Sequence, residues 1–161
     1  MVTALAFVDF TEATPAVVQT AAEMARAFGM QLILMHVSTP DAEAEGEQLR
    51  TDISREGIAV EMHRVHEQLQ HLAEDCKRRG VDATALLVRG QSVRGNPIPK
   101  MIRELKRIKP ALIVMGTHQH GRLFEALFGS ASLALSRKAT CPILLVPGHA
   151  VPHVWQNARN R

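Results

Sequence analysis

The chain has 161 residues, of which 46% are hydrophobic and 22% charged, values typical of a single globular domain with a buried core. A net charge of +3 and an aromatic content of 4% exclude the basic, aromatic-rich surface with which proteins bind nucleic acids. Two cysteines without a C-x-x-C motif exclude a disulfide framework, and no apolar run approaches the ~20 residues that span a bilayer.

Five short apolar runs predict β-strands. Continuous apolar runs of this length are typical of parallel strands that are covered on both faces. They cover residues 4–8, 32–37, 83–88, 111–115 and 143–146.

Between these runs, apolar residues recur at helical spacing. Thr11 is the expected N-cap of the first helix, and Gly29 and Gly80 are expected to end the first two. Residues 38–57 are polar and predict an irregular connection. The predicted helices cover residues 13–28, 58–79, 98–108 and a last stretch that begins near residue 130 and includes residue 139.

Strands and helices thus alternate along the whole chain, which predicts an open parallel sheet with helices on both faces and right-handed crossovers. We expect one domain over residues 1–149 and a frayed tail over residues 150–161. The first residues lack the positively charged segment of a signal peptide, and both thiols are expected to be reduced. A cytoplasmic location is therefore expected.

A ligand of such a sheet binds at the carboxyl ends of the strands, where the strand order reverses. Asp9, Val37 and Gly116 stand at three predicted strand ends. Asp9 can accept a hydrogen bond from a ribose hydroxyl or an adenine amino group, Val37 can offer backbone groups to the base, and the N–H groups of Gly129 and Ser130 can bind phosphates. Each feature also has a structural explanation, as a helix cap or a tight turn. Their convergence on one edge favours a nucleotide site.

The sequence gives less support to a metal site, a reactive cysteine or a catalytic motif. His63 and His66 can share one helix face, but His71 points elsewhere, so a solvated helix face is expected rather than a metal site. Cys141 precedes Pro142 at a strand entry and is expected to be structural. Neither a G-x-S-x-G motif nor a Walker A motif is present, so no catalytic residue is assigned.

Five stretches together have a recognisable pattern. They are ALAFVDFTEAT at 4–14, LILMHV at 32–37, RGNPIPKMI at 94–102, ALIVMGTHQHGRLFEALFGSAS at 111–132 and CPILLVP at 141–147. Through these stretches the sequence resembles the universal stress protein family over nearly the whole chain. The resemblance implies a three-layer α/β/α fold, Rossmann-like or flavodoxin-like, with a five-stranded parallel sheet of order 3-2-1-4-5. It also implies a homodimer that pairs through the last strand, from Ile143 to Val146.

Nucleotide-binding members of this family carry the signature G-x2-G-x9-G-[ST]. In this sequence its positions are Gly116, Gln119, Gly129 and Ser130, so the middle glycine is replaced. The resemblance implies that ATP, with or without Mg²⁺, is the ligand. The implied binding residues are Asp9, Phe10, Val37, Met115, Gly116, His118, Gln119, Gly129, Ser130 and Ala131.

Gln119 leaves two functions open. If the turn only needs a left-handed residue, a non-glycine residue costs roughly 1–2 kcal/mol, about ten-fold or somewhat more in affinity. If a phosphate touches the Cα atom, the side chain blocks binding, and GTHQ at 116–119 matches a turn found in the branch of the family that does not bind ATP. The favoured function is a dimeric, ATP-binding stress-response switch with at most slow hydrolysis. The alternative is a nucleotide-free dimeric interaction protein whose cleft Gln119 closes.

Overall fold

The computed structural model describes residues 1–38, 55–89, 97–117 and 134–147. The expected tail at 150–161 and the expected turn at 118–132 lie outside these ranges. The elements are β1 (Thr3–Phe7), α1 (Thr14–Ala27), β2 (Gln31–Ser38), α2 (Arg55–Arg78), β3 (Ala83–Arg89), α3 (Ile98–Ile108), β4 (Leu112–Thr117) and β5 (Ile143–Pro147).

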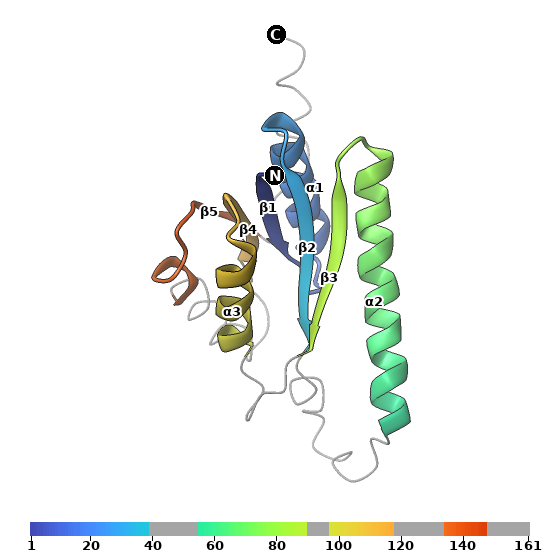
Figure 1. The fold of residues 1–161 in the computed structure, drawn as a ribbon. Helices are drawn as coiled ribbons and strands as arrows, with labels where there is room; N and C mark the ends of the chain where they lie inside the picture. Colours follow the sequence, from blue (N-terminus) through green and yellow to red (C-terminus); the bar gives the residue numbers. More distant parts are fainter. Residues whose placement is uncertain (39–54, 90–96, 118–133, 148–161) are drawn as a thin grey trace.

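The strands form one parallel sheet of order β3-β2-β1-β4-β5, which confirms the predicted fold class and strand order (Figure 1). β1 lies at the centre, with Leu5 opposite Ile33 of β2 and Ile113 of β4. The strand order reverses at β1, because β2 and β3 extend the sheet on one side and β4 and β5 on the other. The carboxyl end of β1 is therefore the position at which sheets of this order generally bind a ligand.

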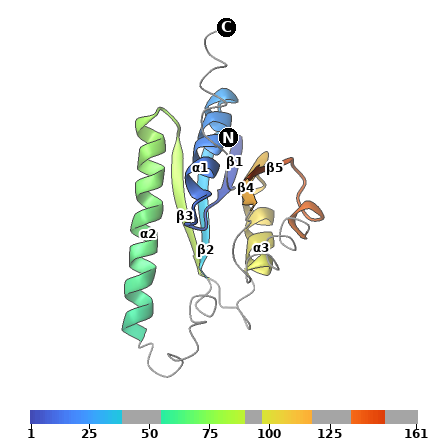
Figure 2. The same cartoon turned by 180° about the vertical axis from the view of Figure 1, so that it is seen from behind.

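Alternating residues of the strands face two separate hydrophobic clusters. One cluster joins Ala4, Ala6 and Val8 of the first strand region to α1 and α2, and the other joins Leu5 and Phe7 to α3. The helices thus form the outer layers of a three-layer structure (Figures 1 and 2). Burial on both faces explains why the central strands appear in the sequence as continuous apolar runs.

Two glycines end helices as expected. Gly29 (φ +62°) follows α1 and Gly80 (φ +80°) follows α2, so each adopts the left-handed conformation that lacks a steric penalty only for glycine. α3 covers residues 98–108 as predicted. β2 continues to Ser38 and α2 already begins at Arg55, so both elements reach into the stretch 38–57 that the sequence predicted to be irregular. The rest of that stretch lies outside the described residues.

The N-cap prediction for the first helix was wrong. α1 begins at Thr14, its N-cap residue is Ala13, and no side chain accepts a capping hydrogen bond there. The reason is that the Thr11 hydroxyl donates a hydrogen bond to Asp9 at 2.8 Å, while the Thr11 carbonyl accepts one from the Thr14 N–H at 3.0 Å. Thr11 therefore belongs to the turn before the helix.

Candidate functional site

The site begins where β1 ends and β2 continues. The register between the two strands ends at Phe7 opposite Met35, and the Val8 N–H then donates to the Met35 carbonyl at 2.8 Å. β2 extends beyond this point to Ser38. The chain leaving β1 therefore turns away beside the last residues of β2, at the position where the strand order reverses.

Asp9 organises the turn that follows β1. Its Oδ1 atom accepts hydrogen bonds from the Thr11 N–H at 3.2 Å, the Thr11 hydroxyl at 2.8 Å and the Thr14 hydroxyl at 3.1 Å. This is an Asx-type turn that ties the end of β1 to the first residue of α1. Asp9 was considered as a helix cap, but the N-cap residue of α1 is Ala13, and Asp9 stabilises the preceding turn instead. The turn fixes a half-buried carboxylate at the sheet edge.

Phe10, the next residue, has a left-handed backbone with φ +59°. A side chain in this conformation costs roughly 1–2 kcal/mol, which the surrounding contacts must offset. The Phe10 ring packs against the α1 side of the core and lies at a 56° tilt to the His36 ring, with ring centroids 5.0 Å apart. Phe10 therefore forms one wall of the turn at the sheet edge.

His36 connects β2 to the same turn. Its Nδ1 atom lies 2.7 Å from the Val8 carbonyl oxygen. A carbonyl only accepts, so Nδ1 carries the proton and donates, which in the neutral ring leaves Nε2 as an acceptor. The sequence placed His36 in the right segment but did not identify it as a site residue, because its partner is a backbone atom 28 residues away.

Val37 follows at the end of β2, opposite Val88 of β3. The Met35 carbonyl points toward β1, and backbone groups of a parallel strand alternate in direction, so those of Val37 also point to the β1 side. Since β1 ends at Phe7, they point past its end. The role of Val37 in ligand binding stays a prediction.

Met115 and Gly116 lie inside β4. Met115 is fully buried against the α3 side of the core, so only its backbone can contribute to a site. Gly116 pairs with Val146 and Thr117 with Pro147, so β4 extends further than the predicted run and Gly116 is a strand residue rather than the first residue of a turn. The Thr117 hydroxyl donates to the Val146 carbonyl at 3.5 Å.

The remaining predicted site residues lie outside the described part of the chain. They are His118, Gln119, Gly129, Ser130 and Ala131. Their roles in ligand binding stay predictions. The structure thus brings Asp9, Phe10 and Val37 to one edge, and β4 pairs with the other side of β1 through Leu112 to Val114.

Two further residues of this edge were not predicted from the sequence as site residues. One is His36, described above. The other is Thr14, which is only 6% exposed and whose hydroxyl reaches back to Asp9. The Thr14-Pro15 pair was a usable signal, because proline favours the first turn of a helix and so marks Thr14 as its start.

The thiols and histidines show no convergent arrangement in the described ranges. Burial raises the pKa of both the Cys76 and the Cys141 thiol, and nearby Arg79 partly opposes the shift at Cys76. Nowhere in residues 1–38, 55–89, 97–117 and 134–147 do three or more His, Cys, Asp or Glu side chains group as a metal site requires. On α2, His63 contacts Glu67 at 3.1 Å, with both side chains exposed.

A five-stranded parallel sheet of this order, covered by helices on both faces, defines the Rossmann-like class of α/β proteins. Residues 3–147 match the model of the universal stress protein family, and the chain belongs to this family. None of the helices in the described ranges is long and apolar enough to cross a membrane.

Two relatives from Bacillus subtilis (strain 168) are similar to this chain in sequence. The chain is 26% identical to the universal stress protein YxiE over 100 residues, and 37% identical to the stress response protein NhaX over 54 residues. These matches cover 62% and 34% of this chain. They span 59% and 32% of the two relatives' own lengths.

Solved structures of universal stress proteins share the fold over most of the chain. One, in complex with cAMP, is 19% identical with a TM-score of 0.63 and covers 91% of this chain and 97% of its own. Another, from Archaeoglobus fulgidus in complex with dAMP, is 18% identical with a TM-score of 0.61 over 90% and 97%. A third, from Burkholderia pseudomallei, is 24% identical with a TM-score of 0.62 over 90% and 95%.

Proposed function

We propose that this chain binds an adenine nucleotide, with ATP as the principal ligand, at the carboxyl ends of β1, β2 and β4. The observation that carries the proposal is the turn at the reversal point, where the Asp9 carboxylate is fixed by Thr11 and Thr14 beside the end of β2. A fixed carboxylate accepts from ribose hydroxyls or an adenine amino group, and the Val37 backbone lies within the same edge. Two proteins of the same fold hold the adenine nucleotides cAMP and dAMP, which favours an adenine ligand.

The phosphates would be bound by the segment from Gly116 to Ala131. Gly129 and Ser130 would offer backbone N–H groups, and His118 and Gln119 would flank the turn. Mg²⁺ would arrive with the phosphates, because this ion is commonly held by phosphate oxygens and water rather than by a cage of protein side chains. Any hydrolysis would be slow, since the sequence assigns no catalytic residue.

We further propose that the protein is a cytoplasmic homodimer that pairs through β5 and acts as a stress-response switch. β5 is an edge strand of the sheet, and its residue Leu145 is 46% exposed. An edge strand offers unpaired backbone groups, and an apolar side chain on it adds area that a second copy can bury. A partner protein would distinguish the nucleotide-bound dimer from the nucleotide-free dimer.

The direct test is to denature the purified protein and identify the released nucleotide by mass spectrometry. The proposal predicts an adenine nucleotide that is absent from the Asp9→Ala and Ser130→Ala variants. A Lys77→Gln variant is the matched control, because Lys77 is an exposed residue of α2. Release of the same nucleotide from the Asp9→Ala variant would place the ligand elsewhere.

The sequence GTHQ at residues 116–119 supports a second candidate, a nucleotide-free interaction protein. A Gln119→Gly variant separates the two. If Gln119 closes the cleft, the variant gains nucleotide affinity sharply. If binding is retained, the gain is about ten-fold or somewhat more, the size of a left-handed backbone penalty of roughly 1–2 kcal/mol.

A further inference from the structure

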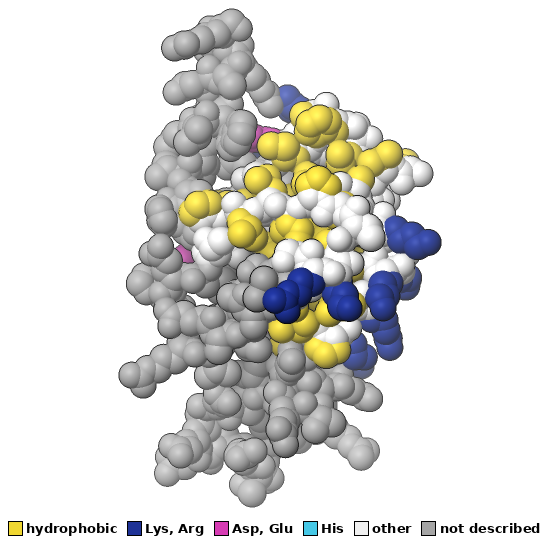
Figure 3. Space-filling model, turned by 90° about the vertical axis from the view of Figure 1, so that its left-hand side faces the viewer, with side chains coloured by type: hydrophobic (Ala, Val, Ile, Leu, Met, Phe, Trp, Pro, Cys, Tyr) yellow, Lys and Arg dark blue, Asp and Glu magenta, His cyan; other side chains and the backbone are white. Residues whose placement is uncertain are grey.

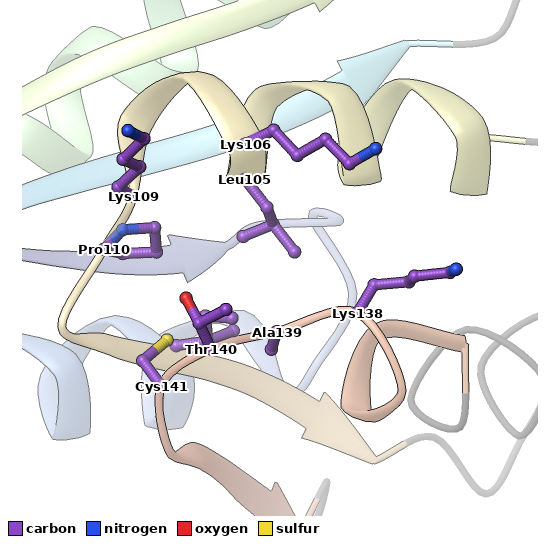
Figure 4. A pocket seen from close by; sticks show the side chains of 9 residues that line it. Leu105, Lys106, Lys109, Pro110, Lys138, Ala139, Thr140 and Cys141 are labelled. Atoms are coloured by element: carbon purple, nitrogen blue, oxygen red, sulfur yellow. The ribbon is translucent and has the colours of Figure 1, made fainter.

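A pocket lies at the amino ends of β4 and β5, away from the proposed nucleotide site. It has a volume of about 330 Å³ and opens between the end of α3 and the segment that enters β5 (Figure 4). Its lining includes Leu105, Lys106 and Lys109 on one wall and Lys138, Thr140 and Cys141 on the other. This volume is at the lower end of the range for small-ligand sites, about 300–1,000 Å³.

The pocket combines an apolar interior with a cationic rim. Leu105 points from α3 toward the opposite wall, where Thr140 and Cys141 lie (Figure 4). Lys106 and Lys138 extend from the two walls toward the same end of the pocket, and Lys109 lies at the other end. Among the lining residues in the described part of the chain, none carries a carboxylate.

The three lysines are not neutralised within the described ranges, where none of them forms an ion pair. The acid closest in sequence, Glu104, is 7% exposed and is held by Arg107 at 2.6 Å. Lys and Arg side chains gather on this side of the molecule, and the acidic side chains visible in the same view lie apart from them (Figure 3). An anion at this position would therefore meet positive charge without a competing carboxylate.

Lys109 is held at the rim by its backbone. It has φ +50° at the C-terminal cap of α3, donates its N–H to the Leu105 carbonyl at 2.8 Å, and precedes the buried Pro110. A lysine in the left-handed conformation is unusual, because glycine adopts it at lower cost. Residues kept in such conformations cluster at ligand sites, which is consistent with a functional reason for lysine here.

We propose that this pocket binds a small organic anion with an apolar body. The apolar part would lie against Leu105 and the anionic group between the amines of Lys106 and Lys138, with Lys109 and the Thr140 hydroxyl available to a second polar group. The pocket lies at the amino ends of β4 and β5, whereas the nucleotide site lies at the carboxyl ends. The two sites can therefore be occupied independently.

The test uses octanoate as the probe and Cys141 as the reporter. The chain has two cysteines, of which Cys76 is 3% exposed, whereas Cys141 is partly exposed and lines the pocket. We expect octanoate to slow alkylation of native Cys141 by iodoacetamide in a saturable manner, as followed by mass spectrometry. Octanol, which is neutral, should protect much less, and added ATP should leave the octanoate protection unchanged.

Variants of the pocket lysines test whether their charges cause the protection of Cys141 by octanoate. A Lys106→Gln/Lys138→Gln double variant should weaken octanoate protection about ten-fold or more, because charge-assisted hydrogen bonds are the strong ones. Lys77→Gln, on a helix that packs on the other face of the sheet, should change nothing. Equal protection by octanol or full protection in the double variant would each overturn the proposal.

Discussion

The imidazole Nδ1 of His36 lies 2.7 Å from the carbonyl oxygen of Val8 and so joins the end of β2 to the chain leaving β1. The contact lies directly before Asp9, and the His36 ring also meets the Phe10 ring. One side chain therefore supports both walls of the turn at the reversal point. His36 is a positioning residue of the proposed nucleotide site.

Replacing His36 should weaken this turn. A His36→Phe variant keeps an aromatic ring but removes the donor, so the Val8 carbonyl loses its partner and the free energy of unfolding should fall by about 0.5–1.5 kcal/mol. Urea denaturation measures the change. His36→Asn, which retains a donor near the Nδ1 position, is the matched control and should lose less. A His36→Phe protein as stable as the wild type would show that the contact has no energetic role.

Lys109→Gly should stabilise the fold relative to Lys109→Ala by about 0.5–1 kcal/mol, because only glycine adopts φ +50° without a steric penalty. Both variants remove the same exposed side chain, so the difference reports the backbone alone. Thermal and urea unfolding of the two variants provide the measurement. If alanine proves equal to glycine, the left-handed cap of α3 is not strained.

The Cys76 thiol should make stability depend on alkaline pH. Burial raises the pKa of Cys76 in the folded state, whereas the unfolded chain has the ordinary value of about 8.5. The contribution is fully present below that pH and is lost as the pH rises through the folded-state pKa, because the unfolded chain loses its proton first. Between pH 7 and 10 the free energy of unfolding should fall more steeply for the wild type than for Cys76→Ala. If the free energy of unfolding falls equally with pH in both proteins, the buried Cys76 thiol does not cause the pH dependence.

The dimer predicted through β5 can be tested at Leu145. A Leu145→Lys variant places a charge on the exposed edge strand and should shift the protein toward the monomer in sedimentation equilibrium. Val60→Lys is the control, since Val60 is 69% exposed but lies on α2, and it should leave the mass unchanged. A Leu145→Lys protein that remains dimeric would place the interface elsewhere.

The fold was predictable because its signals are local and strong. α3 follows Pro97 and ends before Lys109-Pro110, and its observed bounds equal the predicted ones. The strands appeared as apolar runs because helices cover both faces of the sheet. The prediction that Thr11 caps α1 was wrong for a local reason too. The sequence alone does not show that the Thr11 hydroxyl donates a hydrogen bond to Asp9.

The placement of candidate residues at strand ends was predictable, but their local geometry was not. Asp9, Val37 and Gly116 were placed at strand ends by topology alone, and the structure brings the first two to one edge. The left-handed backbone of Phe10 has no sequence signal, because bulky residues rarely adopt it. The contact of His36 with Val8 depends on strand pairing and cannot be inferred from spacing.

The central claim, that the reversal point of this sheet binds an adenine nucleotide, is tested most directly by calorimetric titration of the folded wild-type protein with ATP in the presence of Mg²⁺. We predict saturable binding of one ATP per chain that is lost or strongly weakened in Asp9→Ala. A folded protein that gives no heat of binding with ATP at several temperatures, and shows no nucleotide by mass spectrometry, would contradict the account.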